Sequence, residues 1–77
     1  SLRVESGTRQ LALLRLSTSG KAAAWLNGSA AERTDAGPGA AWLVDLQPGS
    51  NDVLLRFEGA GSASLSVQAA SRIDLRL

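Results

Sequence analysis

The chain contains few side chains that could support catalysis, because histidine, cysteine, methionine and tyrosine are all absent. Without histidine or cysteine it can form neither Ser-His-Asp nor Cys-His nucleophilic sites, and it has no thiolate for a metal. Glycoside hydrolysis needs only two carboxylates about 5 to 10 Å apart, and Glu32, Asp35 and Asp45 are the candidates. No local pattern places two of them on one face of a deep pocket. The sequence therefore predicts a chain that is not an enzyme and has no cofactor.

The two tryptophans point to binding rather than catalysis. Trp25 and Trp42 are the largest side chains in a chain whose only other aromatic residue is Phe57. An exposed indole can stack on the apolar face of a sugar, whereas a buried indole contributes about 150 to 250 Å² to a core. Trp42 shares its alternation parity with Val44 and Leu46, which predicts a core position for Trp42.

Trp25 is the candidate centre of a carbohydrate-binding face. It points outward if Ala22, Ala24 and Leu26 point inward, because side chains of a strand alternate between its two faces. A core position for Trp25 is the alternative. Polar residues close to it in the sequence could bind sugar hydroxyl groups. The predicted ligand-binding set is therefore Trp25, Asn27, Glu32, Arg33 and Asp35.

Two other patterns suggest a calcium site and a glycosylation site, but a turn explains the same residues equally well. Asp35, Asn51 and Asp52 could supply oxygen ligands to calcium, but no Asp-x-Asp-x-Asp spacing is present. Asn27-Gly28-Ser29 matches an N-glycosylation sequon, yet an Asn-Gly pair also suits a type I′ hairpin turn. We interpret all of these residues as turn formers, and we predict no metal site.

The composition indicates one small globular domain over residues 1–77. Hydrophobic residues make up 44% of the chain, but many are alanines, and no cysteine is available for a disulfide. We therefore expect a domain that is marginally stable alone or that is supported by a partner domain or a second copy. The net charge is +1 and the basic residues are spread singly, which argues against nucleic-acid binding. No run of about 18 apolar residues is present, so no membrane span is predicted.

Turn signals recur along the chain at the spacing that is typical of a β-sandwich. A period of two in the apolar residues predicts strands over 52–58, 62–68 and 72–77, with Leu54 sharing the polar face of the first. Further strands are predicted over 10–16, 21–27, 29–33 and 40–46, with a short helix as the alternative for 10–16. The predicted fold class is all-β, a small antiparallel β-sandwich of jelly-roll type with about six to eight short strands.

The segment Trp25-Leu26-Asn27-Gly28, followed by Leu46-Gln47-Pro48-Gly49-Ser50-Asn51, resembles galactose-binding-like jelly-roll modules. The resemblance covers about residues 21 to 68 and includes the apolar strand that contains Val53, Leu55 and Phe57. Such modules are commonly attached to bacterial glycoside hydrolases, esterases and large surface proteins. Members of this family are usually nearly twice as long, so the resemblance implies either that the N-terminal strands are missing or that this is a trimmed version.

The resemblance implies a non-catalytic accessory module of a larger secreted, periplasmic or cell-surface protein, with weak carbohydrate binding. Its partners would be other domains of the parent chain, or a partner subunit. The alternative is a purely structural or assembly module that packs through its sheet faces or edge strands. Residues 72–77 end the chain on an alternating apolar strand. That strand would be tucked into the sandwich or would pair with a neighbour by strand addition.

Overall fold

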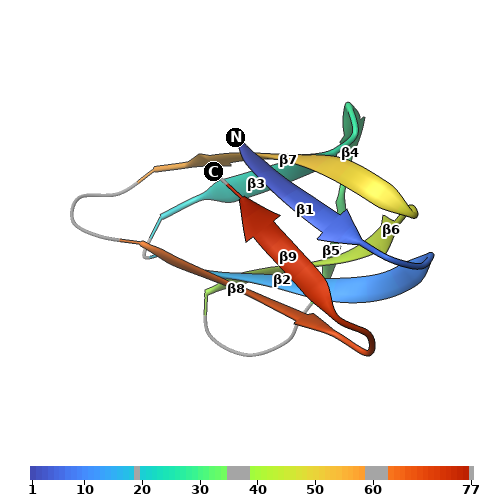
Figure 1. Cartoon of the computed structure of the whole chain (residues 1–77). Coiled ribbons are helices and arrows are strands. Elements are labelled where there is room, and N and C mark those ends of the chain that lie inside the picture. The colour runs from blue at the N-terminus through green and yellow to red at the C-terminus, as the bar shows by residue number, and fades with distance from the viewer. Residues whose placement is uncertain (19, 35–38, 59–62, 77) are drawn as a thin grey trace.

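The computed structural model describes residues 1–18, 20–34, 39–58 and 63–76, and in these ranges the chain forms two antiparallel sheets (Figure 1). In spatial order, the five-stranded sheet consists of β4 (Ser29–Ala30), β3 (Ala22–Leu26), β7 (Gly49–Phe57), β1 (Leu2–Ser6) and β9 (Ile73–Arg76). The four-stranded sheet consists of β5 (Glu32–Thr34), β6 (Ala40–Leu46), β2 (Gln10–Ser17) and β8 (Ser64–Ala69). The predicted all-β sandwich is therefore confirmed.

The strands pair in a nested order. β1 pairs with β9, β2 with β8, β3 with β7, and β5 with β6, all antiparallel. The pairs β1–β7 and β2–β6 then join these units into the two sheets. Pairing the first strand with the last, and so on inward, is the arrangement of a jelly roll.

The described residues form nine strands, which is more than the six to eight expected. β1 is additional, and the return strand expected over 29–33 is divided into β4 and β5. The division falls at Ala31, whose N–H donates to the carbonyl oxygen of Ala24 (2.8 Å) as the chain passes from one sheet to the other. Residues 10–16 form a strand rather than a helix.

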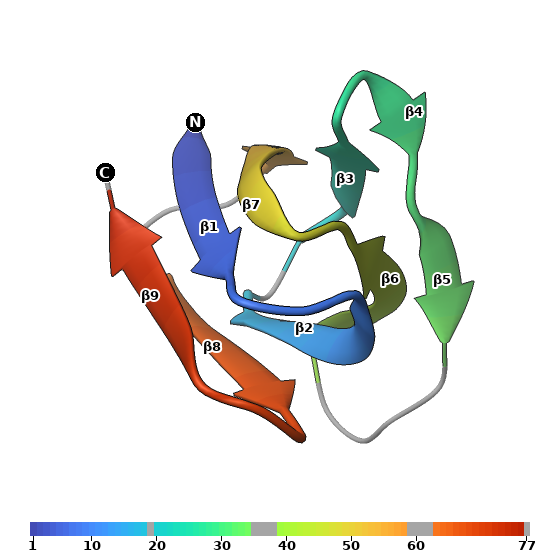
Figure 2. The ribbon, with the colours of Figure 1, turned by 45° about the vertical axis from the view of Figure 1, so that its right-hand side comes forward.

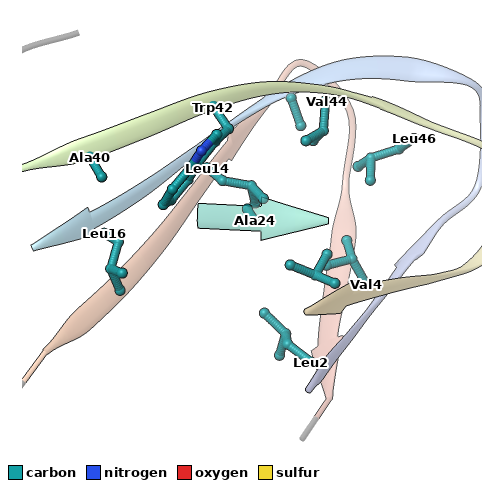
Figure 3. Close-up of a cluster of buried hydrophobic side chains, with 11 residues drawn as sticks. Leu2, Val4, Leu14, Leu16, Ala24, Ala40, Trp42, Val44 and Leu46 are labelled. Carbon is teal, nitrogen blue, oxygen red and sulfur yellow. The ribbon is translucent and has the colours of Figure 1, made fainter. Parts of the chain in front are cut away.

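The core lies between the sheets and takes alternate side chains from β1, β2 and β6, with one buried residue each from β3 and β7 (Figure 3). Trp42 is 2% exposed, so its predicted core position is confirmed. The buried apolar residues of this cluster are Leu2, Val4, Ala12, Leu14, Leu16, Ala24, Ala40, Trp42, Val44, Leu46 and Val53. Three members of this core are alanines, and Trp42 is its single aromatic residue.

The two lateral edges of the sandwich are formed by different pairs of strands. β4 and β5 lie at one edge, and β8 and β9 lie at the other (Figure 2). The first edge is made of very short strands, whereas β8 and β9 contain six and four residues. The start of β1 and the end of β9 lie close to the second edge, because β1 and β9 are neighbours (Figure 2).

Candidate functional site

Trp25 lies on the outer face of the five-stranded sheet. Its neighbour Ala24 is 3% exposed, and Leu26 packs against the core, so the alternation of β3 turns the indole away from the sandwich interior. Trp25 is partly exposed and lies opposite Leu54 of β7, which is itself 52% exposed. On its other side it lies opposite Ala30 of β4. The alternation argument for an outward Trp25 is confirmed.

Two open hollows adjoin the indole. One, of about 320 Å³, is lined by Lys21, Ala22, Ala23, Trp25, Arg56 and Glu58. The other, of about 230 Å³, is lined by Ser1, Trp25, Gly28, Asp52, Val53 and Leu54. We call the set Trp25, Asp52, Leu54 and Arg56 the Trp25 face. It combines an apolar platform with a hydrogen-bond donor and an acceptor on the same strand, β7.

Asn27, predicted as a ligand-binding residue, uses its side chain to hold the turn between β3 and β4. Its backbone has a φ of 50°, and its Oδ1 atom accepts the N–H of Asp52 (2.8 Å). Its Nδ2 atom donates to Oδ1 of Asn51 (3.1 Å). Because both polar ends of the side chain hold the turn against β7, the structure gives Asn27 a structural role.

The other predicted site residues lie away from Trp25. Glu32 is exposed and lies opposite Leu43, on the outer face of the four-stranded sheet. The Arg33 guanidinium lies 5.7 Å from the ring centroid of Trp42, and its Nη1 atom donates to the carbonyl oxygen of Ala22 (3.1 Å). Asp35 lies outside the described residues. The structure therefore does not bring the predicted set together around Trp25.

The polar residues that lie beside Trp25 are Asp52 and Arg56, and not the predicted Glu32 and Arg33. They are distant from Trp25 along the chain and reach it only through the pairing of β3 with β7, in which Trp25 lies opposite Leu54. The alternation of residues 52–58 placed Asp52, Leu54 and Arg56 on one face. Asp52 and Arg56 could have been predicted as neighbours of Trp25 only if the pairing of β3 with β7 had been known.

Asn51 anchors the turn between β6 and β7 and is fully buried. Its Nδ2 atom donates to the carbonyl oxygens of Gln47 (2.9 Å), Val4 (3.2 Å) and Gly49 (3.3 Å). Its Oδ1 atom accepts the N–H of Gln47 (2.9 Å) as well as Nδ2 of Asn27. The turn interpretation therefore accounts for this residue. In the described part of the chain, no three or more of His, Cys, Asp and Glu gather as a metal site would require.

Asp45, one of the carboxylates considered for catalysis, is paired with Arg9. The Nη2 atom of Arg9 lies 2.8 Å from Oδ2 of Asp45, and its Nε atom donates to Oδ1 at 3.3 Å. The hydrogen bonds from Arg9, together with its positive charge, hold the pKa of the Asp45 carboxyl below its ordinary value, against a smaller opposing effect of desolvation. A general acid needs a raised pKa, so this environment does not suit Asp45 to that role.

A larger apolar opening of about 450 Å³ lies between the two sheets. Phe57 and Leu75, which are 47% and 48% exposed, lie at it. Its remaining lining residues are Ser1, Leu2, Leu16, Val53, Leu55, Ala63 and Leu65. It continues the core outward and, among the described residues, Ser1 is the only polar side chain that lines it. Ligand sites usually carry several polar groups that fix orientation, so the Trp25 face is the stronger candidate.

Comparisons with protein families, curated proteins and solved structures found no match to this chain. The likeness to galactose-binding-like modules therefore stays a prediction. No helix in the described residues has the length and apolar character that crossing a membrane requires.

Proposed function

We propose that this chain is a non-catalytic accessory module of a larger protein and that its Trp25 face binds carbohydrate weakly. The observation that carries the proposal is the partly exposed indole of Trp25 between two open hollows. In a domain with only two tryptophans and one phenylalanine, an indole outside the core does not serve the packing of that core. Its position on the outer face of the sheet suits stacking against a sugar ring.

Polar groups beside the indole support the same proposal. Arg56 can donate hydrogen bonds to sugar hydroxyl groups, and Asp52 can accept them. Both project from the exposed face of β7 that also carries Leu54. Lys21 and Glu58 border the hollow on the side of Arg56 and extend the polar rim. The Trp25 face therefore offers both apolar and hydrogen-bonding contacts, which match the apolar face and the hydroxyl groups of a sugar ring.

The open shape of the two hollows argues for low affinity. Enclosed pockets commonly bury about 70 to 90% of a small ligand's surface, and a platform on a sheet face buries much less. We expect a Kd of about 1 mM for a single sugar unit. Useful binding would then depend on several sites engaging one polysaccharide, because linked sites raise the effective concentration of ligand.

A second candidate function, packing against another domain of the parent protein, is favoured by the outer face of the four-stranded sheet. Leu11 and Leu43 there are 60% and 43% exposed. Leu13, half-buried, lies directly opposite Leu43 in the pairing of β2 with β6. Adjacent apolar side chains on a sheet face are typical of an interaction surface.

The carbohydrate proposal is tested by glycan-array binding of the wild-type chain and of Trp25→Ala, followed by titration calorimetry on any glycan bound. Trp25→Ala should abolish binding, and Arg56→Ala should weaken it. The matched control is Leu11→Ala, which removes an exposed apolar side chain from the opposite sheet and should leave binding unchanged. Unchanged binding in Trp25→Ala, or no glycan bound by the wild type, would refute the proposal.

A spectroscopic control shows whether the indole is accessible in solution. Trp42 should emit at short wavelength and resist iodide, because it is 2% exposed. Trp25 should supply the red-shifted emission that iodide quenches, and Trp25→Phe should remove this component. Two protected indoles would instead favour the packing function, since they would mean that the Trp25 face is covered.

A further inference from the structure

We propose that β9 pairs antiparallel with β9 of a second copy, which joins the two five-stranded sheets edge to edge. β9 is the last strand of its sheet, and within the described ranges no strand pairs with its outer edge. In Figure 2, β9 lies at the side of the sandwich opposite β4 and β5. An unpaired edge of this kind is a template for strand addition. The inference does not depend on carbohydrate binding.

The charges on β1 and β9 show that β9 lacks partners of opposite sign directly across the strand pair. Arg76 lies opposite Arg3, and Asp74 lies opposite Glu5. Like charges directly opposite each other destabilise a strand pair. The diagonal contact between Nε of Arg76 and Oε1 of Glu5, at 3.9 Å, compensates for this in part. A strand on the free edge could supply the missing opposite charges.

A second copy of β9 supplies those charges in one particular register. When Leu75 lies opposite its own copy on a twofold axis, Asp74 of each chain lies opposite Arg76 of the other. Two Asp–Arg pairs then form by symmetry, which is the self-complementary arrangement of a twofold interface. Moving the axis to Asp74 would bring the two Asp74 carboxylates together and set Arg76 opposite Arg72. An axis at Ile73 would pair Asp74 with Arg72, but Arg72 lies outside β9. The register centred on Leu75 is therefore the one in which the charged residues of β9 itself pair with opposite sign.

The inward face of β9 supports the same register. Leu75 is 48% exposed at the apolar opening between the sheets, although it belongs to the face of β9 that is turned toward the core. In the proposed pairing, the two Leu75 side chains meet directly across the interface. Side chains opposite each other in an antiparallel pair approach within about 4.5 to 5.5 Å at Cβ, so each would cover exposed apolar surface of the other.

The dimer would leave the Trp25 face free. β9 is separated from β3 by β1 and β7 in the sheet order. A twofold axis perpendicular to the joined sheets places both Trp25 faces on the same side of the assembly. If the carbohydrate proposal also holds, the dimer would present two weak sites to one polysaccharide, which is the geometry that raises avidity.

The test is sedimentation velocity over a dilution series that reaches about 1 mM, the Kd range of weak association. The wild type should show concentration-dependent dimers. Asp74→Arg replaces the two Asp–Arg pairs by two Arg–Arg pairs and should weaken dimerisation about tenfold or more. The double variant Asp74→Arg/Arg76→Asp restores opposite charges across the axis and should recover dimers. Glu32→Arg, on β5 at the other edge, makes the same charge change and should have no effect.

Asp74→Arg should not fail by unfolding, because it replaces the like-charge pair with Glu5 by an opposite-charge pair. Its thermal unfolding midpoint should equal or exceed that of the wild type at concentrations where both are monomeric. A wild type that stays monomeric at about 1 mM would overturn the proposal. So would dimerisation that is insensitive to Asp74→Arg, or a double variant that dimerises no better than the single one.

Discussion

Replacing the buried Asn51 amide by a carboxylate should destabilise the fold more than any comparable surface change. Asn51→Asp keeps the shape of the side chain but puts an acceptor oxygen where Nδ2 donates to three carbonyl oxygens, at 2.9, 3.2 and 3.3 Å. These contacts tie the turn between β6 and β7 to Val4 of β1 and, through Oδ1, to Asn27 in the turn after β3. The variant turns three attractive contacts into repulsive ones inside the protein.

The expected cost follows from the number of buried groups left without a donor. Each unsatisfied buried polar group costs about 1 to 3 kcal/mol, and burying an unpaired charge adds to this. With three carbonyl oxygens left without their donor, we expect Asn51→Asp to lower the free energy of unfolding at neutral pH by at least about 3 kcal/mol. A domain of this size has only roughly 4 to 12 kcal/mol in total, so the melting midpoint should fall by at least about 12 °C.

The destabilisation should depend on pH in a direction that burial dictates. Desolvation and three facing carbonyl oxygens raise the pKa of the introduced carboxyl in the folded state, while in the unfolded state the pKa stays near 3.9. Between these two values the folded state binds more protons than the unfolded state. The difference between variant and wild type should therefore be smallest below about pH 3.9 and should grow as the pH rises through the folded-state pKa.

Urea unfolding of both proteins from pH 3 to 8, followed by far-UV circular dichroism, measures this difference. Gln68→Glu is the matched control, because it makes the same amide-to-carboxylate change on an exposed residue of β8 and should cost less than about 0.5 kcal/mol. A loss below about 1 kcal/mol that does not vary with pH would show that the amide network does not stabilise the turn.

Two further predictions concern a glycine and a surface ion pair. Gly39 has a φ of +83°, and a Cβ atom there would lie 2.5 Å from the carbonyl oxygen of Leu16. Gly39→Ala should therefore cost about 1 to 3 kcal/mol in chemical unfolding, whereas Gly7→Ala, which meets nothing within 4 Å, should be nearly neutral. Arg9 lowers the pKa of Asp45 from its ordinary value of 3.8, so the pair's stabilisation is complete above that value and is lost as the pH falls through the folded-state pKa. Arg9→Ala should move the NMR-detected titration of Asp45 upward, and no shift would exclude the pair in solution.

The sandwich could be predicted because strands with one buried face leave a period of two in the sequence. Residues 64–69 and 73–76 show that alternation without interruption, and both form strands. β1 shows the same alternation over only four residues, Leu2 to Glu5, before the polar Ser6 takes a buried position. The division into β4 and β5 also leaves no mark in the sequence. The backbone hydrogen bond from Ala31 to Ala24 still ties the chain to β3, and from Glu32 onward the chain pairs with β6 instead.

The candidate site shows what a single sequence can and cannot predict. The orientation of Trp25 follows from its neighbours Ala24 and Leu26, so it was predictable from local alternation. Its polar neighbours were not, because sequence proximity to Trp25 pointed to Glu32 and Arg33 while the sheet order places Asp52 and Arg56 beside it. The order of the strands in a sheet depends on the packing of the whole core, so it cannot be inferred from any single segment.

The two lateral edges of the sandwich differ in strand length and in charge, so association should favour one edge over the other. At one edge, β4 and β5 have two and three residues, and Arg33 crosses from β5 over Trp42 to the carbonyl oxygen of Ala22 on β3. Short strands and a charged side chain are the usual means by which a sheet edge is blocked. At the other edge, β9 is longer and its outward charges alternate in a self-complementary order. Edge pairing should therefore occur through β9 and not through the edge formed by β4 and β5, and the charge variants of Asp74 on β9 and Glu32 on β5 distinguish between these edges.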